Sequence, residues 1–417
     1  MTKLRRRTLV ATGLALPFIA HAQSTARVVI VGGGFGGASA ARALRRDAPK
    51  LDVTLIEAND IFAACPFSNL VIAGTRPIAS QYFGYQRLAA EGIRVIHAEA
   101  TGIDPTARRV TLSAGAAVSY DRLILSPGID LAWGAVPGYD EAASTRMPHA
   151  WKAGAQTMLL RQQLEAMPDG GTVVLSVPAN PYRCPPGPYE RASLIAWYLR
   201  GAKPRSKIIV LDSKDNFSKQ KLFQSGWSRL YPGRLEWVSQ SNGGTVTRVD
   251  PATLTFHTDF GSHKADVANV IPPQRAGKIA AIAGVADHTG WCPIDPVTFE
   301  SRRIPGIHVI GDAAIAGAMP KSAFAANAQA KACAAAVARL LAGGTPDEPR
   351  LINTCYSLLA QGHAISVAGV YKPVNGVLTE VPGSGGTSPL DTPDDVRYLE
   401  AQYADAWFST ITHEAFG

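Results

Sequence analysis

Gly32, Gly34 and Gly37 form a G-x-G-x-x-G pattern, which is the spacing of a phosphate-binding turn. The pattern directly follows the apolar run 27–31 and opens a helical stretch. The first glycine permits a tight turn, the second lets the backbone approach a pyrophosphate, and the third lets the helix pack closely on the strand. Glu57 ends a second apolar run 20 residues after Gly37, where a carboxylate binds ribose hydroxyls. The sequence therefore predicts a dinucleotide site on a βαβ unit.

Two later motifs favour FAD as the dinucleotide. Gly311 and Asp312 end another apolar run, and Lys321 follows shortly before an alanine-rich helical stretch. Together with the Ser-Pro-Gly segment at 126–128, this ordered series resembles the motifs of the two-dinucleotide-binding flavoprotein family. The resemblance implies that Asp312 holds the ribityl chain of FAD. It also implies that the alanine-rich helix directs its positive N-terminal end at the flavin.

A second strand–helix–strand module lacks a glycine turn. Its first predicted strand, 172–177, is followed by segment 178–188, in which five of eleven residues are proline. Proline has no backbone N–H and a fixed φ, so this loop cannot offer the donors that hold a pyrophosphate. We therefore expect that the protein does not use NAD(P). Cys184 lies within this proline-rich loop.

Four segments resemble the flavoprotein subunit of flavocytochrome c sulfide dehydrogenase and, more distantly, sulfide:quinone reductases. These segments are 65–69, 181–191, 353–357 and 403–407. The resemblance implies that Cys65 forms a thioether with the flavin of FAD. It also implies that Cys184 and Cys355, which are 171 positions apart, form a redox-active disulfide beside the flavin. The alternative for this pair is an inert structural disulfide.

The same resemblance implies a periplasmic FAD-dependent sulfide dehydrogenase. Sulfide would enter, sulfur or polysulfide would leave, and FAD would pass electrons singly to a haem. Because the chain has no C-x-x-C-H motif, the haem would belong to a c-type cytochrome on a partner chain. Two alternatives stay open. One is a sulfide:quinone reductase, and the other is a flavoprotein partner of a sulfur-carrier or thiosulfate-oxidation system.

The remaining residues with reactive or aromatic side chains are expected to be structural. Cys292 and Cys333 should pack as small hydrophobic residues. The histidines have no ligand spacing, and we expect no metal site. Trp407, near the C-terminus, is expected to pack in the core.

Residues 1–22 have the pattern of a cleavable export signal. Basic residues at 3–7 precede the apolar run 9–20, and the segment 20–22 fits signal-peptidase cleavage. We expect a periplasmic protein without a transmembrane segment. Its adjacent arginines are compatible with export by the twin-arginine route. The formal net charge falls from +8 to +4 when four basic residues leave with the signal. That charge is too small to indicate nucleic-acid binding.

The order of these segments predicts an α/β fold with two Rossmann-like domains and a C-terminal α+β segment. A chain of 417 residues exceeds what one hydrophobic core usually supports. The predicted parts are a split FAD-binding domain at 24–150 and 291–350, a second Rossmann-like domain at 151–290, and a C-terminal domain at 351–417.

Overall fold

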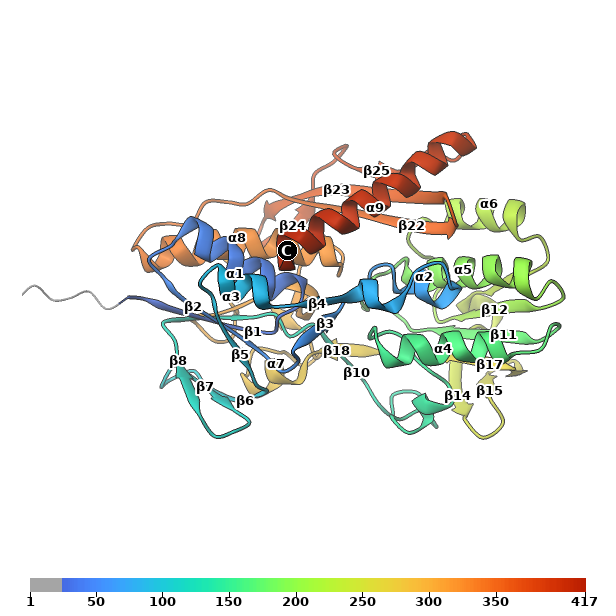
Figure 1. Ribbon diagram of the computed structural model, residues 1–417, viewed down its shortest axis with the longest axis horizontal. Coiled ribbons are helices and arrows are strands. Elements are labelled where there is room, and N and C mark those ends of the chain that lie inside the picture. Colours follow the sequence, from blue (N-terminus) through green and yellow to red (C-terminus); the bar gives the residue numbers. More distant parts are fainter. Residues whose placement is uncertain (1–24) are drawn as a thin grey trace, which may run out of the picture.

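Two parallel sheets form the framework of the molecule and confirm the predicted α/β fold class (Figure 1). The computed structural model describes residues 25–417, so the predicted export signal at 1–22 lies outside the described part of the chain. Each sheet occupies one half of the molecule and is covered by helices (Figure 1).

The first sheet contains the predicted βαβ unit and is parallel throughout. Its strand order is β20 (Ile307–Val309), β9 (Arg122–Leu125), β1 (Arg27–Val31), β2 (Asp52–Glu57) and β5 (Arg94–His97). Buried Val, Ile and Leu dominate β1 and β9, as expected for strands covered on both faces. Helix α1 (Phe35–Asp47) joins β1 to β2 and packs against α8 (Ala323–Leu341). Because β20 pairs with β9, the chain returns to this sheet after it has formed the second.

The second sheet is also parallel. Its strand order is β13 (Leu235–Val238), β12 (Lys207–Asp212), β11 (Thr172–Val177) and β17 (Val267–Val270), with helices α4 (Ala155–Ala166), α5 (Gly187–Ala202) and α6 (Gln220–Leu230) around it. The proline-rich loop, 178–186, joins β11 to α5. It therefore occupies the place that the glycine turn occupies between β1 and α1.

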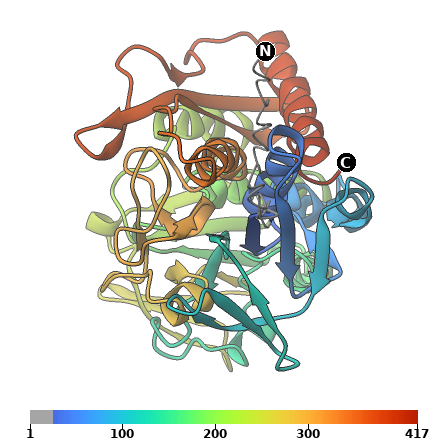
Figure 2. The same ribbon diagram turned by 90° about the vertical axis from the view of Figure 1, so that its left-hand side faces the viewer.

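A C-terminal hairpin connects the two halves. Its strands are β22 (Leu351–Ala360) and β23 (His363–Val374), extended by β24 (Val377–Glu380) and β25 (Gly386–Thr387). β22 packs on α8 of the first half and on α5 and α6 of the second (Figures 1 and 2). Helix α9 (Asp394–Phe416) covers β23 and α1. Consequently, a residue on β22 can meet residues from both halves.

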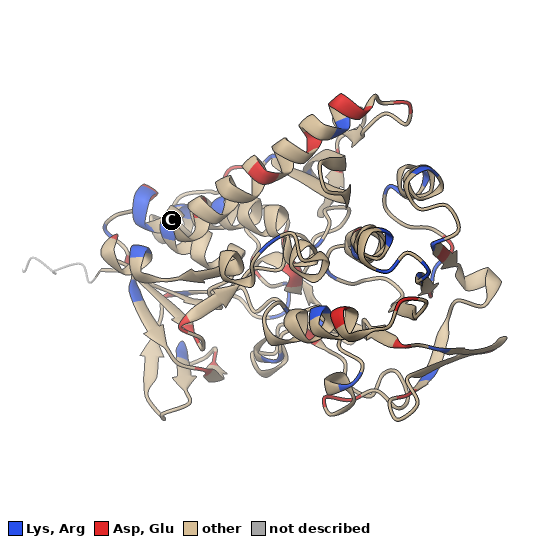
Figure 3. Ribbon diagram, turned by 45° about the vertical axis from the view of Figure 1, so that its right-hand side comes forward, with Lys and Arg blue, Asp and Glu red and all other residues tan. Residues whose placement is uncertain are grey.

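Smaller elements complete the framework. They are α2 (Ser68–Ala73), α3 (Gln86–Ala90), α7 (Lys278–Ile282), the pairs β3 (Ile61–Ala63) with β4 (Tyr82–Gly84), β10 (Ile129–Leu131) with β18 (Gln274–Ala276) and β19 (Cys292–Pro293) with β21 (Ala314–Ile315), and the sheets β6 (Ala100–Asp104), β7 (Arg109–Leu112), β8 (Ala117–Ser119) and β14 (Val246–Asp250), β15 (Thr255–Thr258), β16 (Gly261–Lys264). Lysine and arginine residues are spread over both halves, whereas acidic residues recur along α9 (Figure 3).

Gly37 allows a contact that no other residue type permits. A Cβ atom at this position would lie 1.8 Å from the carbonyl oxygen of Gly32. We expect Gly37→Ala to lower the free energy of unfolding by about 3 kcal/mol or more, because the helix would have to move off the strand. Urea unfolding of the natural chain and the variant measures this change.

Gly201→Ala is the matched control, since a Cβ there meets nothing within 4 Å in its helix. That variant should be more stable than the natural chain by about 0.5–1 kcal/mol, because alanine is the better helix former. Equal stability of the two variants would contradict the proposed packing role of Gly37.

Candidate functional site

A cavity of about 500 Å³ lies between the two halves, and we call it the main cavity. The glycine turn, the proline-rich loop, β22 and the start of α8 all contribute to its wall. The predicted site residues in this wall are Gly32, Gly34, Glu57, Cys65, Cys184, Gly311, Asp312 and Cys355. Gly37 and Lys321 are not among the described residues that line it.

The glycine turn and Glu57 form one end of the main cavity. The backbone N–H of Gly33 donates to Oε2 of Glu57 at 2.7 Å, and Asn59 holds Oε1 through its backbone N–H and its amide at 3.0 and 2.9 Å. Gly32 has a φ of 99°, and a Cβ there would lie 2.3 Å from the carbonyl oxygen of Ser126. Helix α1 begins directly after Gly34, so its N-terminal N–H groups face this end of the cavity. This arrangement suits a bound phosphate beside a ribose.

Asp312 and the start of α8 form another part of the wall. Burial raises the pKa of Asp312, although Arg183 and Lys321 act in the opposite direction. Ser322 caps α8 by accepting from the backbone N–H of Ala325 at 3.0 Å. The N-terminus of α8 therefore points at the cavity, as the FAD motif predicts.

The sequence predicts that Lys321 binds the cofactor, but its amine is bonded to the protein backbone instead. Its amine donates to the carbonyl oxygens of Asp312 and Ala314 at 2.7 and 2.8 Å, and it lies 3.9 Å from the ring centre of Trp291. The side chain thus supports the turn that carries Asp312. Burial lowers the pKa of Lys321 to about 8.

Three polar atoms of the cavity wall have no hydrogen-bond partner among residues 25–417. They are Oδ1 of Asp312 and the Nε1 atoms of Trp151 and Trp407. Buried polar atoms are almost always bonded in proteins, so one acceptor and two donors are available for a bound molecule. With the glycine cradle, these residues fit a dinucleotide such as FAD. Trp407 packs against the core as expected, and it also lines the cavity, which the sequence did not predict.

The three cysteines that the sequence predicts to be functional share the main cavity, although they come from distant segments. Cys184 has a φ of 57°, and its N–H donates to the carbonyl oxygen of Lys321 at 2.8 Å. Asn353 donates through its amide to Sγ of Cys355 at 3.5 Å and accepts from the hydroxyl of Ser322 at 2.6 Å. The turn before α8 therefore contacts both cysteine segments. The predicted bond between Cys184 and Cys355 is not formed in the structure, where all five cysteines are free.

The Cys184 thiol is affected both by burial and by Cys355. Burial raises the pKa of the Cys184 thiol, and the neighbouring Cys355 raises it further. Cys292 and Cys333 are fully buried in the hydrophobic core, which confirms that they are packing residues.

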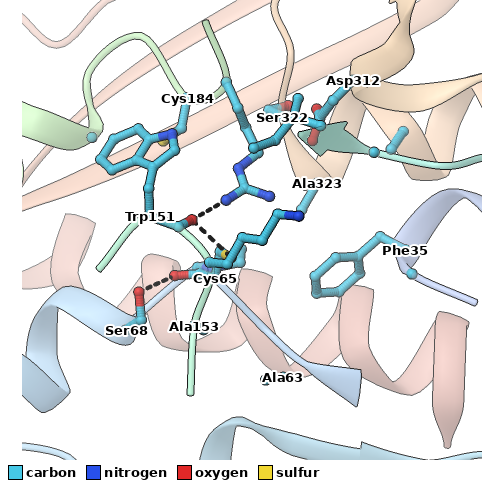
Figure 4. A pocket seen from close by; sticks show the side chains of 18 of the residues that line it. Phe35, Ala63, Cys65, Ser68, Trp151, Ala153, Cys184, Asp312, Ser322 and Ala323 are labelled. Atoms are coloured by element: carbon cyan, nitrogen blue, oxygen red, sulfur yellow. Dashed lines mark hydrogen bonds between the residues drawn. The ribbon is translucent and has the colours of Figure 1, made fainter. Parts of the chain in front are cut away.

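Cys65 lies beside a buried cation. Its sulfur is 3.6 Å from the carbonyl oxygen of Trp151, and the guanidinium of Arg183 donates to the same oxygen (Figure 4). Burial lowers the pKa of Arg183, whereas the neighbouring Cys65 and Asp312 raise it.

Glu190 and Lys219 are charged residues of this site that sequence reasoning missed. Glu190 accepts from the backbone N–H of Leu358 at 2.9 Å and from the amide of Asn69 at 2.8 Å, and burial raises its pKa. Lys219 is only 7% exposed. Burial lowers its pKa to about 8, against the opposing effects of Cys355 and Glu190.

The amine of Lys219 reaches the strand that carries Cys355. It donates to Oγ of Ser357 at 2.8 Å and to the carbonyl oxygen of Cys355 at 3.4 Å. Glu190 stands six residues after Cys184 and could have been found as a carboxylate beside the loop. Lys219 has no sequence signal, because it lies in an ordinary polar segment.

Arg191 fixes the local backbone around these charges. It is buried, and it donates to the side chains of Asn69 and Asn269 and to the carbonyl oxygens of His149 and Ala150. These bonds hold α5, α2 and the segment before Trp151 together. Removal of one partner from such a buried network is strongly destabilising.

Comparisons with known proteins agree with this geometry. Residues 157–272 match the family described as sulfide dehydrogenase (flavocytochrome c) flavoprotein chain, central, and residues 347–416 match flavocytochrome c sulphide dehydrogenase, flavin-binding. Residues 26–159 match pyridine nucleotide-disulphide oxidoreductase. The sulfide dehydrogenase (flavocytochrome c) flavoprotein chain of Chlorobaculum thiosulfatiphilum is 60% identical over 47 residues, which are 11% of this chain and 98% of that sequence. This chain belongs to that flavoprotein family.

Other relatives of this flavoprotein are more distant. The mitochondrial sulfide:quinone oxidoreductase of Mus musculus is 22% identical over 302 residues, which cover 68% of this chain and 65% of the mouse protein. The match thus spans slightly less than two thirds of that relative. The solved sulfide:quinone oxidoreductase from Aquifex aeolicus has a TM-score of 0.74 at 18% identity and covers 94% of this chain and 92% of its own. That likeness supports the Rossmann-like fold.

The low pKa of Lys219 predicts a pH dependence of stability. In the folded flavoprotein the pKa is about 8, against an ordinary value of 10.5. Between these values the unfolded chain binds more protons, so the contribution of Lys219 to stability increases as pH rises through 8. From about pH 7.5 to about pH 9.5, the natural chain should gain about 2 kcal/mol relative to Lys219→Met. Urea unfolding at both pH values measures this difference.

Lys221→Met is the matched control for this experiment, because it removes an exposed amine two positions away. Parallel pH profiles for the natural chain and Lys219→Met would show that the Lys219 amine is not desolvated as described.

Proposed function

We propose that this chain is the flavoprotein subunit of a periplasmic sulfide dehydrogenase that uses FAD and passes electrons to a c-type cytochrome. One observation carries the proposal: Cys184 and Cys355 line the same cavity as the dinucleotide cradle. A thiol pair beside a flavin can accept a sulfur nucleophile and pass electrons on. An inert structural pair has no need to share this cavity.

The residues of the main cavity would hold FAD along its length. Glu57 would bind ribose hydroxyls, the glycine turn would hold the pyrophosphate, and Asp312 would bind the ribityl chain through its free Oδ1. When bound, FAD supplies the conversion of a two-electron oxidation into single-electron transfers. The N-terminus of α8 stabilises negative charge near it.

The cysteine pair would receive the sulfide. In the oxidised protein, hydrosulfide attacks one sulfur of a Cys184–Cys355 disulfide. A new S–S bond forms to give a persulfide, and the disulfide breaks to release the other cysteine as a thiolate. Re-formation of the disulfide from the persulfide and the thiolate would release zero-valent sulfur, a proton and two electrons, and bound FAD would accept the electrons. Lys219 and the amide of Asn353 stabilise negative charge on this pair.

The proline-rich loop supports the expectation that NAD(P) is not the electron donor. Cys184 and Arg183 of this loop point into the main cavity instead of building a second nucleotide turn. The electrons would therefore come from sulfide.

The acceptor is proposed from the family. The relative from Chlorobaculum thiosulfatiphilum is named as the flavoprotein chain of a flavocytochrome, and this chain has no C-x-x-C-H motif of its own. Haem would therefore reside on a partner cytochrome. The pattern of residues 1–22 supports periplasmic location. In the described part of the chain, no helix combines the length and apolar character needed to cross a membrane.

A sulfide:quinone reductase is the second candidate function. Several relatives carry the name sulfide:quinone oxidoreductase, and one solved example shares the fold. The two functions share the sulfide half-reaction and differ in the acceptor. Rates with a c-type cytochrome and with a water-soluble quinone therefore separate them, and the proposal requires that the cytochrome is faster.

Replacement of either cysteine should stop the sulfide half-reaction. We expect Cys184→Ser and Cys355→Ser to lower the rate of flavin reduction by sulfide at least about a hundredfold, because neither variant can form the disulfide that sulfide attacks. Anaerobic stopped-flow absorbance of the flavin measures this rate.

The control is Cys333→Ala, which removes a buried thiol outside the main cavity. It should keep the natural rate, and all three variants should keep their flavin. A natural rate in Cys355→Ser would refute the role of the pair.

Cys65 is the proposed attachment residue for FAD. After acid denaturation, the yellow colour should stay with the natural polypeptide and be released into the supernatant from Cys65→Ala, since a thioether survives acid. Absorbance and mass spectrometry of both fractions measure the attachment. Cys292→Ala, which removes a buried thiol, should keep the colour on the polypeptide. Free FAD from the natural protein would refute the covalent link.

A further inference from the structure

A second cavity, of about 450 Å³, lies at the start of α6, and we call it the α6 cavity. Its wall consists of Asn216, Lys219, Gln220, Lys221, Leu222, Gln224 and Thr387. Lys221 and Thr387 are exposed at the surface, whereas Lys219 is buried. The wall of the α6 cavity thus includes both surface residues and the buried Lys219, whose amine bonds to the strand that carries Cys355.

Lys219 separates the α6 cavity from the main cavity. It belongs to the wall of the first, and its amine is bonded to Ser357 and to the carbonyl oxygen of Cys355, which belong to the wall of the second. Lys219 therefore contacts the walls of both cavities.

The wall of the α6 cavity is suited to small anions. It has two lysines and the amides of Asn216, Gln220 and Gln224, and no carboxylate is among the described residues that line it. The nearest acidic residue in sequence, Asp215, accepts from the backbone N–H of Ser241 at 2.8 Å. A cleft lined by one sign of charge raises the local concentration of oppositely charged ligands.

A second route would matter if a dinucleotide filled the main cavity, because the wall of that cavity also holds Cys184 and Cys355. A small substrate would then need another approach to the pair. Lys219 and the α6 cavity adjoin the strand that carries Cys355.

We propose that the α6 cavity is the access site for small inorganic sulfur anions, and that hydrosulfide passes Lys219 to reach Cys184 and Cys355. This inference rests on the proposed function, because it assigns the route by which its substrate arrives. Hydrosulfide carries one negative charge and is small enough to pass a single displaced amine. Lys221 attracts the anion at the surface, and Lys219 holds it beside the disulfide.

Charge reversal at the mouth of the α6 cavity tests the route. Lys221→Glu should lower the second-order rate of flavin reduction by hydrosulfide on the order of threefold to tenfold at low ionic strength, and salt should reduce the difference. The limiting rate at saturating sulfide should not change, because the chemistry at the cysteines is intact. Thr387→Trp should lower the second-order rate at every salt concentration, because it narrows the cavity.

Alkylation of the reduced, flavin-loaded protein gives a readout that does not depend on sulfide chemistry. Iodoacetate is an anion and iodoacetamide is neutral, so their rates of reaction with Cys184 and Cys355 report the charge along the route. Lys221→Glu should slow iodoacetate more than iodoacetamide, as measured by mass spectrometry of peptides. Lys264→Glu, which reverses an exposed charge on β16, is the matched control and should leave both rates unchanged.

The two arms distinguish failure of the route from failure of the proposed function. If the natural protein is not reduced by sulfide, the proposed function fails, and the alkylation rates still decide whether anions use this cavity. If sulfide reduces the protein and Lys221→Glu behaves like Lys264→Glu in both arms, the access route is overturned.

Discussion

The turn before α8 is the constraint on which the site depends. The carbonyl oxygen of Lys321 accepts from the N–H of Cys184, and the hydroxyl of Ser322 donates to Asn353, two residues before Cys355. One cysteine follows a strand of the second sheet, and the other lies on the C-terminal hairpin. No local interaction could bring them together, so the turn holds both segments against the start of the helix that would face the flavin. The amine of Lys321 supports the same turn by donating to the carbonyl oxygens of Asp312 and Ala314.

Buried charge is the second feature that shapes the site. Arg183, Glu190 and Lys219 are desolvated, and each has charged or hydrogen-bonding neighbours in the same region. An isolated buried charge is strongly destabilising, whereas a charge with partners can persist. Such groups shift the pKa values of the thiols and carboxyls around them, and shifted values are typical of sites where protons and electrons move.

The proline-rich loop shows how one fold serves a different chemistry. In the first half, glycines let the backbone approach a pyrophosphate between β1 and α1. In the second half, prolines occupy the equivalent place between β11 and α5 and direct Cys184 into the main cavity. The same strand–turn–helix geometry thus forms a dinucleotide cradle in one half and carries a cavity-lining cysteine in the other.

The sequence by itself determined the features that depend on neighbours along the chain. The spacing of Gly32, Gly34 and Gly37, the carboxylate of Glu57 at a strand end, and the prolines around Cys184 all act through local backbone geometry, so the dinucleotide site and the α/β fold could be predicted. Only the tertiary structure decided the features that depend on desolvation and on distant contacts. No local sequence pattern predicts three of these features. They are the burial of Lys219, the position of Trp407 Nε1 in the cavity wall and the bond from the Lys321 amine to the carbonyl oxygen of Asp312. Each results from segments that meet only after the two sheets and the hairpin have packed together.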